Sequence, residues 1–212
     1  MTPHLYVRRV IKMRILIACE ESQTIAKAFR DLGHDAFSCD LSECSGGYPE
    51  WHIQGDAIEI AYTQEWDMMI AHPPCTYLAV SGARWMYNKD GSRNEDREQK
   101  QVQALDFVQK LMDAPIEKIA IENPVSVIST NIRKPDQIIQ PWMFGEEATK
   151  TTCLWLKNLP SLKATDIVGK GEFYISPTGK KLPRWYSDNK NPKSRSKTFK
   201  GIANAIANQW SN

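Results

Sequence analysis

Two residues that could carry covalent chemistry follow two short apolar segments of the chain. Cys75 comes directly after two prolines and the apolar run 66–71, and Glu122 directly follows the apolar run 116–121. Each proline ring fixes its φ at about −65° and holds the preceding residue extended, so the thiol has little freedom to move. A fixed cysteine is a candidate nucleophile, and the carboxyl group of Glu122 is expected to emerge at a comparable end of the sheet.

The elements that must position these residues follow from the apolar patterns. Both runs are short and bounded by breakers, which is typical of buried strands in a parallel sheet, and ligands of open α/β sheets bind at the carboxyl ends of such strands. Strands and helices alternate along the chain, so we predict an α/β fold with a doubly wound, Rossmann-like sheet. Other predicted strands lie at 13–19 and 35–40, and a third candidate strand ends at 55–56. Helices are predicted near 25–32, 94–113 and 199–210.

Charge is distributed unevenly along the 212 residues. Residues 150–200 hold 12 Lys/Arg against 3 Asp/Glu, a net charge of +9, so the rest of the chain carries about −7 of the total of +2. Basic residues interleaved with aromatic ones suit phosphate contact with base stacking, although a solvated irregular surface is the alternative. We divide the chain into an extension (1–12), a catalytic core (13–156), a small basic substrate-binding region (157–198) and a closing helix (199–212).

Composition excludes several classes of protein. The five cysteines are an odd number without paired zinc spacings, and no apolar stretch approaches the roughly 20 residues of a membrane span. We therefore expect no metal site, no membrane association and a reducing, cytoplasmic location.

The motifs at the two strand ends resemble those of a known family. The segment 73–82, Pro-Pro-Cys-Thr-Tyr-Leu-Ala-Val-Ser-Gly, resembles the Pro-Cys nucleophile motif of the DNA cytosine-C5 methyltransferases, and Glu-Asn-Pro at 122–124 resembles their Glu-Asn-Val motif. Compact members carried by phages and prophages are the most similar, which implies a bacterial or phage-infected cell. Lys150 and Thr152 stand where the family has two arginines, and 201–204 is loosely similar to its last cofactor-side motif.

The resemblance implies a mechanism for the candidate catalytic residues. Cys75 would add to C6 of cytosine so that C5 takes a methyl group from S-adenosylmethionine. Glu122 would hydrogen bond to N3 and the exocyclic amine, and Asn123 would hold the loop. Attack requires a thiolate, so we expect a lowered pKa for Cys75. The candidate cations for this effect are Arg84, Arg93 and Arg97.

On the cofactor side, Asp40 is placed to bind ribose hydroxyls and Asp56 to bind the adenine amine. The first turn lacks the family's glycines, and a carboxylate of Glu20 or Glu21 could instead pair with the cofactor's ammonium group. The predicted cofactor-binding residues are Cys19, Glu20, Glu21, Asp40, Leu41, Asp56, Ala57, His72, Pro73 and Asn204. The predicted substrate-binding residues are Pro74, Arg84, Lys150, Thr152, Lys193, Arg195 and Lys197.

Several alternatives for substrate and function stay open. Family members that read duplex DNA carry a sizeable recognition domain where this chain has only the region 157–198, so single-stranded nucleic acid or a free cytosine nucleotide is an alternative to duplex DNA. The sequence His-Pro-Pro-Cys at 72–75 is also distantly similar to the Asp-Pro-Pro-Tyr motif of amino-methyltransferases, whose chemistry has no use for the cysteine. The glycine-free turn supports a third alternative, a noncatalytic nucleic-acid-binding or anti-restriction protein derived from this fold.

Overall fold

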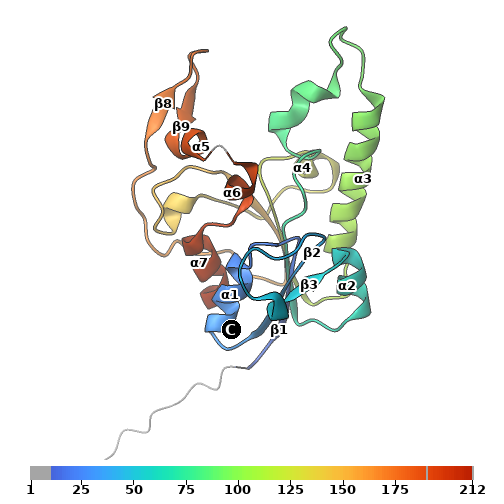
Figure 1. Cartoon of the computed structure of the whole chain (residues 1–212), viewed down its shortest axis with the longest axis vertical. Helices are drawn as coiled ribbons and strands as arrows, with labels where there is room; N and C mark the ends of the chain where they lie inside the picture. The colour runs from blue at the N-terminus through green and yellow to red at the C-terminus, as the bar shows by residue number, and fades with distance from the viewer. Residues whose placement is uncertain (1–10, 190, 212) are drawn as a thin grey trace, which may run out of the picture.

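The computed structural model describes residues 11–189 and 191–211 of the chain (Figure 1). All but the last two residues of the predicted extension 1–12 lie outside the described residues, as does Lys190, and so does the side chain of Lys193. No helix in the described part of the chain is both long enough and apolar enough to cross a membrane.

Seven strands form one sheet in the order β3-β2-β1-β4-β5-β7-β6. Neighbours from β3 to β5 run parallel, whereas β7 is antiparallel to both β5 and β6. The predicted doubly wound, Rossmann-like α/β sheet is therefore confirmed. The strands are β1 (Arg14–Ala18), β2 (Asp35–Asp40), β3 (His52–Gln54), β4 (Met68–Ala71), β5 (Lys118–Asn123), β6 (Gln137–Ile139) and β7 (Thr152–Lys157).

Helices cover both faces of the sheet because the strand residues alternate between two apolar clusters. Ile15 and Ile17 of β1 pack with α1 and α7 on one face, whereas Leu16 packs with α2 and α3 on the other. The closing helix, predicted at 199–210, is present as α7 and buries the apolar face expected of it. The helices are α1 (Thr24–Asp31), α2 (Ala57–Thr63), α3 (Glu95–Met112), α4 (Ile128–Asn131) and α7 (Lys200–Trp210), with 3-10 turns η1 (Pro49–Trp51), η2 (Val80–Met86) and η3 (Pro141–Met143).

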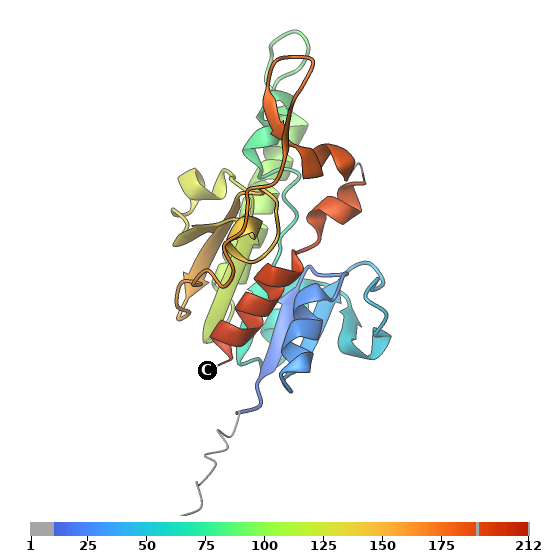
Figure 2. The same ribbon diagram turned by 90° about the vertical axis from the view of Figure 1, so that its left-hand side faces the viewer.

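The described residues of the basic region 157–198 form short elements joined by irregular loops. Leu162 is buried in the core beside α7, and beyond it the chain forms a hairpin of β8 (Phe173–Ile175) and β9 (Lys181–Pro183). Two short helices follow, α5 (Arg184–Asp188) and α6 (Pro192–Ser196). Figures 1 and 2 both show this hairpin and the loop before α3 extending past the same end of the sheet.

That end of the sheet is where the carboxyl ends of the parallel strands lie. The chain order reverses between β1 and β4, and ligands of doubly wound folds bind at such a switch point. The sequence places Cys75 just after β4 and Glu122 at the end of β5, so both belong to this edge.

Candidate active site

The cysteine loop is fixed to the end of the neighbouring strand. Asn123, buried at the end of β5, donates from Nδ2 to the carbonyl oxygen of Pro73 at 2.8 Å. The backbone amides of Leu78 and Ala79 both donate to the carbonyl oxygen of Cys75, at 3.0 and 2.8 Å, and close a turn around it. Cys75 itself is exposed, so its thiol is held in place and open to a ligand.

Backbone hydrogen bonds join this loop to the segment that follows Glu122. The amide of Val80 donates to the carbonyl oxygen of Val125 at 3.1 Å, and the amide of Val127 donates to that of Leu78 at 2.9 Å. The two motifs singled out in the sequence therefore form one structural unit.

Glu122 forms a pair with His72 at the adjacent strand end. The parallel register pairs Ala71 of β4 with Ile121 of β5, so the next residue of each strand lies beside the other. His72 Nδ1 lies 3.1 Å from Glu122 Oε2, and these side chains are only 13% and 21% exposed. This contact was not predicted; the sequence analysis had placed His72 among the cofactor-binding residues.

The surroundings of Glu122 favour its ionised form. Burial alone would raise the pKa of this carboxyl, but the hydrogen bond and charge of His72, the charge of Lys150 and a hydrogen bond from Thr152 outweigh burial. The resulting pKa lies below the ordinary value of a glutamate, so Glu122 is a carboxylate near neutral pH.

The pKa of Cys75 differs from expectation. Although the residue is exposed on one side, partial burial of its thiol and the negative charge of Glu122 raise the pKa of Cys75, and the charge of Lys150 opposes the rise. The expected lowering is therefore wrong for the free protein, and the opposing cation is a lysine rather than an arginine.

The three arginines that had been candidates make other contacts. Arg84 stacks on Trp85 with its guanidinium carbon 4.4 Å from the ring centre, and Arg93 forms an ion pair of 3.0 Å with Glu98. Arg97 donates to the carbonyl oxygen of Thr76 at 2.8 Å, next to the cysteine. Arg97 therefore supports the loop backbone, whereas Arg84 and Arg93 are engaged with other partners.

Lys150 links the active site to the basic region. Its Nζ donates to the carbonyl oxygen of Arg195 at 2.9 Å and lies 5.9 Å from the ring centre of Phe199. Of the predicted substrate-binding residues, Lys150 and Thr152 share this site with Glu122. The side chain of Arg195 instead stacks on Tyr186 at 4.4 Å, and Lys197 Nζ lies 3.5 Å from Ser45 Oγ.

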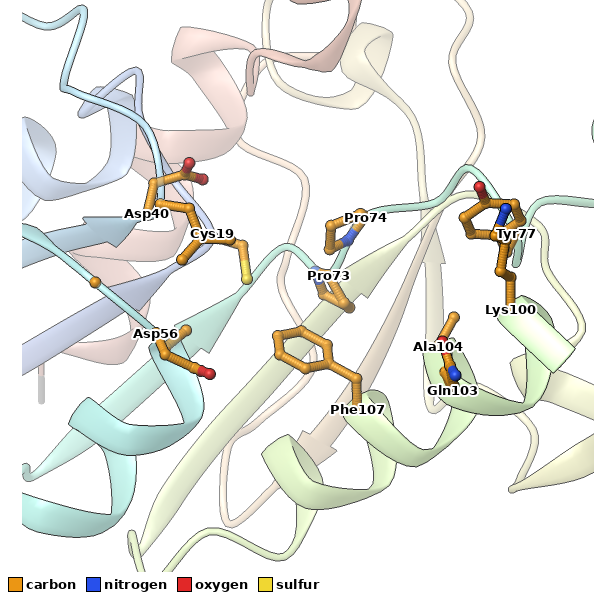
Figure 3. A pocket seen from close by; sticks show the side chains of 13 residues that line it. Cys19, Asp40, Asp56, Pro73, Pro74, Tyr77, Lys100, Gln103, Ala104 and Phe107 are labelled. Carbon is orange, nitrogen blue, oxygen red and sulfur yellow. The ribbon is translucent and has the colours of Figure 1, made fainter.

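A cavity of about 380 Å³ lies beside the cysteine loop, between the ends of β1 to β3 and helix α3. Figure 3 shows Phe107 reaching from α3 toward Pro73, with Asp40 and Asp56 at the other end. Seven predicted residues line this cavity: Cys19, Asp40, Leu41, Asp56, Ala57, Pro73 and Pro74. The sequence analysis missed six other lining residues: Gly55, Tyr77, Lys100, Gln103, Ala104 and Phe107. Ala104 and Phe107 were missed because apolar residues of a helix such as α3 are typical of core packing.

Glu20 has a structural role in the first turn. Its carboxylate is buried and accepts hydrogen bonds from the amides of Ile25 and Ala26, at 2.8 and 3.3 Å, so it caps α1. Burial raises its pKa, and the charge of His72 and these amides oppose the rise. The suggestion that Glu20 pairs with a ligand's ammonium group is thus at odds with its contacts, and neither Glu20 nor Glu21 lines the cavity.

The glycine-free turn forms because two non-glycine residues adopt left-handed backbone angles. Cys19 has a φ of 59° and Gln23 a φ of 58°, a region that glycine reaches without strain. The side chain of Gln23 holds both backbone groups of Tyr48, accepting from its amide at 3.1 Å and donating to its carbonyl at 2.7 Å. The loop 43–48 therefore covers this turn.

Two further residues of the predicted cofactor-binding set do not line the cavity. Asn204 is exposed on α7 and does not line it, and His72 pairs with Glu122 instead.

Burial raises the pKa of Cys19 well above its ordinary value, and the charge of Asp40 adds to the rise, so this thiol is not a nucleophile at neutral pH.

No protein-family model and no curated protein matches this chain. Among solved structures, one similar chain is an E. coli prophage-encoded protein described as a candidate DNA modification methyltransferase. Its TM-score is 0.41 at 11% identity, and the match covers 67% of this chain and 45% of that one. The matched part thus spans less than half of that protein.

Proposed function

We propose that this protein is an S-adenosylmethionine-dependent methyltransferase acting on C5 of cytosine in duplex DNA. The observation that carries the proposal is the placement of Cys75 and Glu122 at adjoining strand ends, with their two loops joined through Asn123. Amino-methylation would have no use for a fixed thiol beside a carboxylate. A noncatalytic binder would have no use for the pair either.

The residues divide the chemistry between them. The thiolate of Cys75 attacks C6 of the base, so that an Sγ–C6 bond forms and electron density moves to C5 and N3. When bound, S-adenosylmethionine supplies the methyl group that C5 takes. Glu122 holds N3 and the exocyclic amine, and Lys150 lies where its charge acts on both the thiol and the carboxylate. Loss of the C5 proton to water then releases Cys75.

The residues of the cavity fit the adenosine part of this cofactor. Its volume of about 380 Å³ falls in the usual range of small-molecule sites, and Phe107 and Ala104 offer an apolar wall for a base. Asp40 and Asp56 offer carboxylates at the ends of β2 and β3, where acids bind nucleoside hydroxyl and amino groups.

Calorimetric titration with S-adenosylmethionine and S-adenosylhomocysteine tests the cofactor. We expect micromolar binding that Asp40→Ala abolishes and that Asp31→Ala, a change of an exposed acid at the end of α1, leaves unchanged. Equal loss in both variants, or no binding by the unchanged protein, would contradict this assignment.

Covalent trapping tests the reaction itself. A cytosine with fluorine at C5 cannot lose that substituent as a proton, so with cofactor present the Sγ–C6 adduct should persist and be visible by mass spectrometry at Cys75. Cys75→Ala should give no adduct, whereas Cys44→Ala should give the normal yield. Glu122→Gln should slow adduct formation roughly 10²-fold or more, and Glu117→Gln, an exposed change just before β5, should not. An adduct at another residue would refute the mechanism.

A second candidate, the same chemistry on single-stranded nucleic acid, is favoured by exposed rings beside cations. Trp85 is 55% exposed beside Arg84, and Phe173 is 36% exposed with Lys181 4.8 Å from its ring centre. Such rings stack on bases whatever their sequence, and phosphates contact the cations.

Anisotropy measurements with labelled oligonucleotides distinguish the two substrates. A single strand should bind more tightly than the duplex of the same sequence. Trp85→Ala should weaken single-strand binding roughly 10-fold, corresponding to about 1.4 kcal/mol of stacking. Tyr62→Ala removes an exposed ring of α2 and serves as the control. Equal binding of duplex and single strand would reject the single-stranded substrate.

A further inference from the structure

The proposed reaction requires a proton that the free protein does not hold on Glu122. As Cys75 adds to C6, negative charge builds up on the ring, and N3 must gain a proton for the adduct to form. Glu122 is the residue placed to provide it, yet its surroundings keep it ionised. A carboxylate accepts hydrogen bonds but has no proton to donate.

His72 is fixed in contact with that carboxylate. Its amide donates to the carbonyl oxygen of Ala18 at 2.9 Å, and Pro73 follows it, so its backbone is held on both sides. The ring nitrogen Nδ1 lies 3.1 Å from Glu122 Oε2. Nε2 is buried and has no hydrogen-bond partner within the described part of the chain. Glu122 is therefore the partner toward which a ring proton can move.

Charged groups surround the pair from several elements. Glu20 after β1 interacts with the charge of His72, and its oxygen atoms already accept the amides at the start of α1. The charge of Lys150, from the loop before β7, lowers the pKa of Glu122. The charge of Glu122 in turn raises the pKa of Cys75, which follows β4. A positive charge on His72 favours the ionised forms of both Glu20 and Glu122. The imidazole thus contacts the carboxyl group of Glu122 and interacts through its charge with that of Glu20.

We propose that His72 supplies, by way of Glu122, the proton that N3 of cytosine takes up when Cys75 adds to C6. This inference rests on the proposed function. The proton moves from Nδ1 of the imidazolium to the carboxylate, which leaves a neutral ring and a neutral carboxyl group. That carboxyl gives the proton to N3 as the Sγ–C6 bond forms. When Cys75 leaves after methyl transfer, the N3 proton returns to Glu122 and then to His72. His72 is therefore a positioning and proton-storing residue that acts through Glu122.

Hydrogen exchange at C5 of cytosine tests this without cofactor. Reversible addition of the thiolate lets C5 take up deuterium from heavy water, so NMR of the oligonucleotide measures the same proton transfer with no methyl group present. His72→Asn keeps a side-chain N–H donor near the position of Nδ1 but cannot store a proton. Exchange by this variant should fall roughly 10²-fold, the lower range of general-acid effects, while oligonucleotide binding stays unchanged.

The pH profile separates proton storage from a structural role. In His72→Asn, exchange requires a protonated Glu122, so the fall in rate toward alkaline pH should begin at a lower pH than in the unchanged protein. His52→Asn removes a β3 histidine that contacts Ser38 and should leave the profile in place. An unchanged rate and profile in His72→Asn would overturn the inference. No exchange by the unchanged protein would instead overturn the proposed function, and the inference with it.

A second measurement uses the unchanged protein and does not depend on the variant's folding. The ring nitrogens of His72 can be observed by ¹⁵N NMR and assigned by their disappearance in His72→Asn or, if that variant does not fold, in His72→Gln. We expect both nitrogens to carry protons at the pH of fastest exchange. A neutral His72 ring at the pH of fastest exchange would also overturn the inference.

Discussion

Gly201 is the position where a single methyl group should do the most damage to the fold. A Cβ at Gly201 would lie 1.7 Å from the carbonyl oxygen of Phe144, whereas Cβ contacts in proteins do not fall below 3.0 Å. The amide of Gly201 also donates to Glu146 Oε1 at 3.2 Å. Relief of the clash therefore needs a backbone movement of roughly 1.3 Å at the start of α7, which would break this hydrogen bond.

The expected loss of stability for Gly201→Ala follows from these two effects. Overpacking in a filled site costs about 1–3 kcal/mol, and losing one hydrogen bond to the partly buried carboxyl group of Glu146 costs about 1–3 kcal/mol more. We therefore expect the free energy of unfolding to fall by about 2–6 kcal/mol. For a chain of this size, about 2–4 °C per kcal/mol implies a Tm lowered by roughly 8–16 °C at the middle of that range.

Scanning calorimetry and urea unfolding measure this loss directly. Gly55→Ala is the matched control, because no atom lies within 4 Å of the methyl group it would add and its φ is outside the left-handed region. The control should stay within about 0.5 kcal/mol of the unchanged protein. If Gly201→Ala also stayed within about 1 kcal/mol, the close approach of α7 to Phe144 would be refuted.

Three further predictions concern side chains of the site and its support. Because the pKa of Cys75 is raised, its alkylation by iodoacetamide should keep accelerating above pH 8, and Lys150→Met should slow it further; a plateau below pH 8 would contradict the raised pKa. Burial raises the pKa of Glu146, so ionising this carboxyl group lowers the stability of the folded protein at neutral pH and has no such effect at a pH where the group is protonated in both the folded and unfolded states. Glu146→Gln should therefore raise the Tm at pH 7, and this gain should vanish at pH 4. Asn123→Ala removes the bond to Pro73 and should lower kcat of methyl transfer roughly 10-fold or more with little change in cofactor Kd; an equal loss in both would indicate general unfolding instead.

The sequence predicted the strands and the closing helix best where the apolar pattern was long and bounded. β4 and β5 are buried runs between breakers, and α7 presents a continuous apolar face. Short elements were missed for a physical reason. β6 has three residues and exists because it pairs with β7, and α2 buries only Ala57 and Ala61, too few to give a helical period.

The pair of His72 and Glu122 could not be predicted because it depends on strand register. One residue of slip between β4 and β5 would point the two side chains to opposite faces of the sheet. The capping role of Glu20 is easier to predict from sequence. An acidic residue shortly before a helix can accept hydrogen bonds from the first helix amides, which lack partners within the helix, and Ile25 is one of these donors. Ala104 and Phe107 of α3 both pack against the core and line the cavity. Apolar periodicity cannot distinguish a core residue from one that also lines a cavity.

Helix α7 has a consequence for how the newly made chain acquires its fold. Ile202, Ile206 and Trp210 fill the apolar cluster beneath β1 and α1, although nearly the whole chain separates them in sequence. During synthesis, the first strand and helix therefore leave the ribosome long before the residues that cover them. The apolar side of α1 therefore stays open to water, or to other proteins that bind exposed apolar surface, until α7 has emerged. The nascent protein is thus prone to aggregate during the interval in which α1 has emerged and α7 has not.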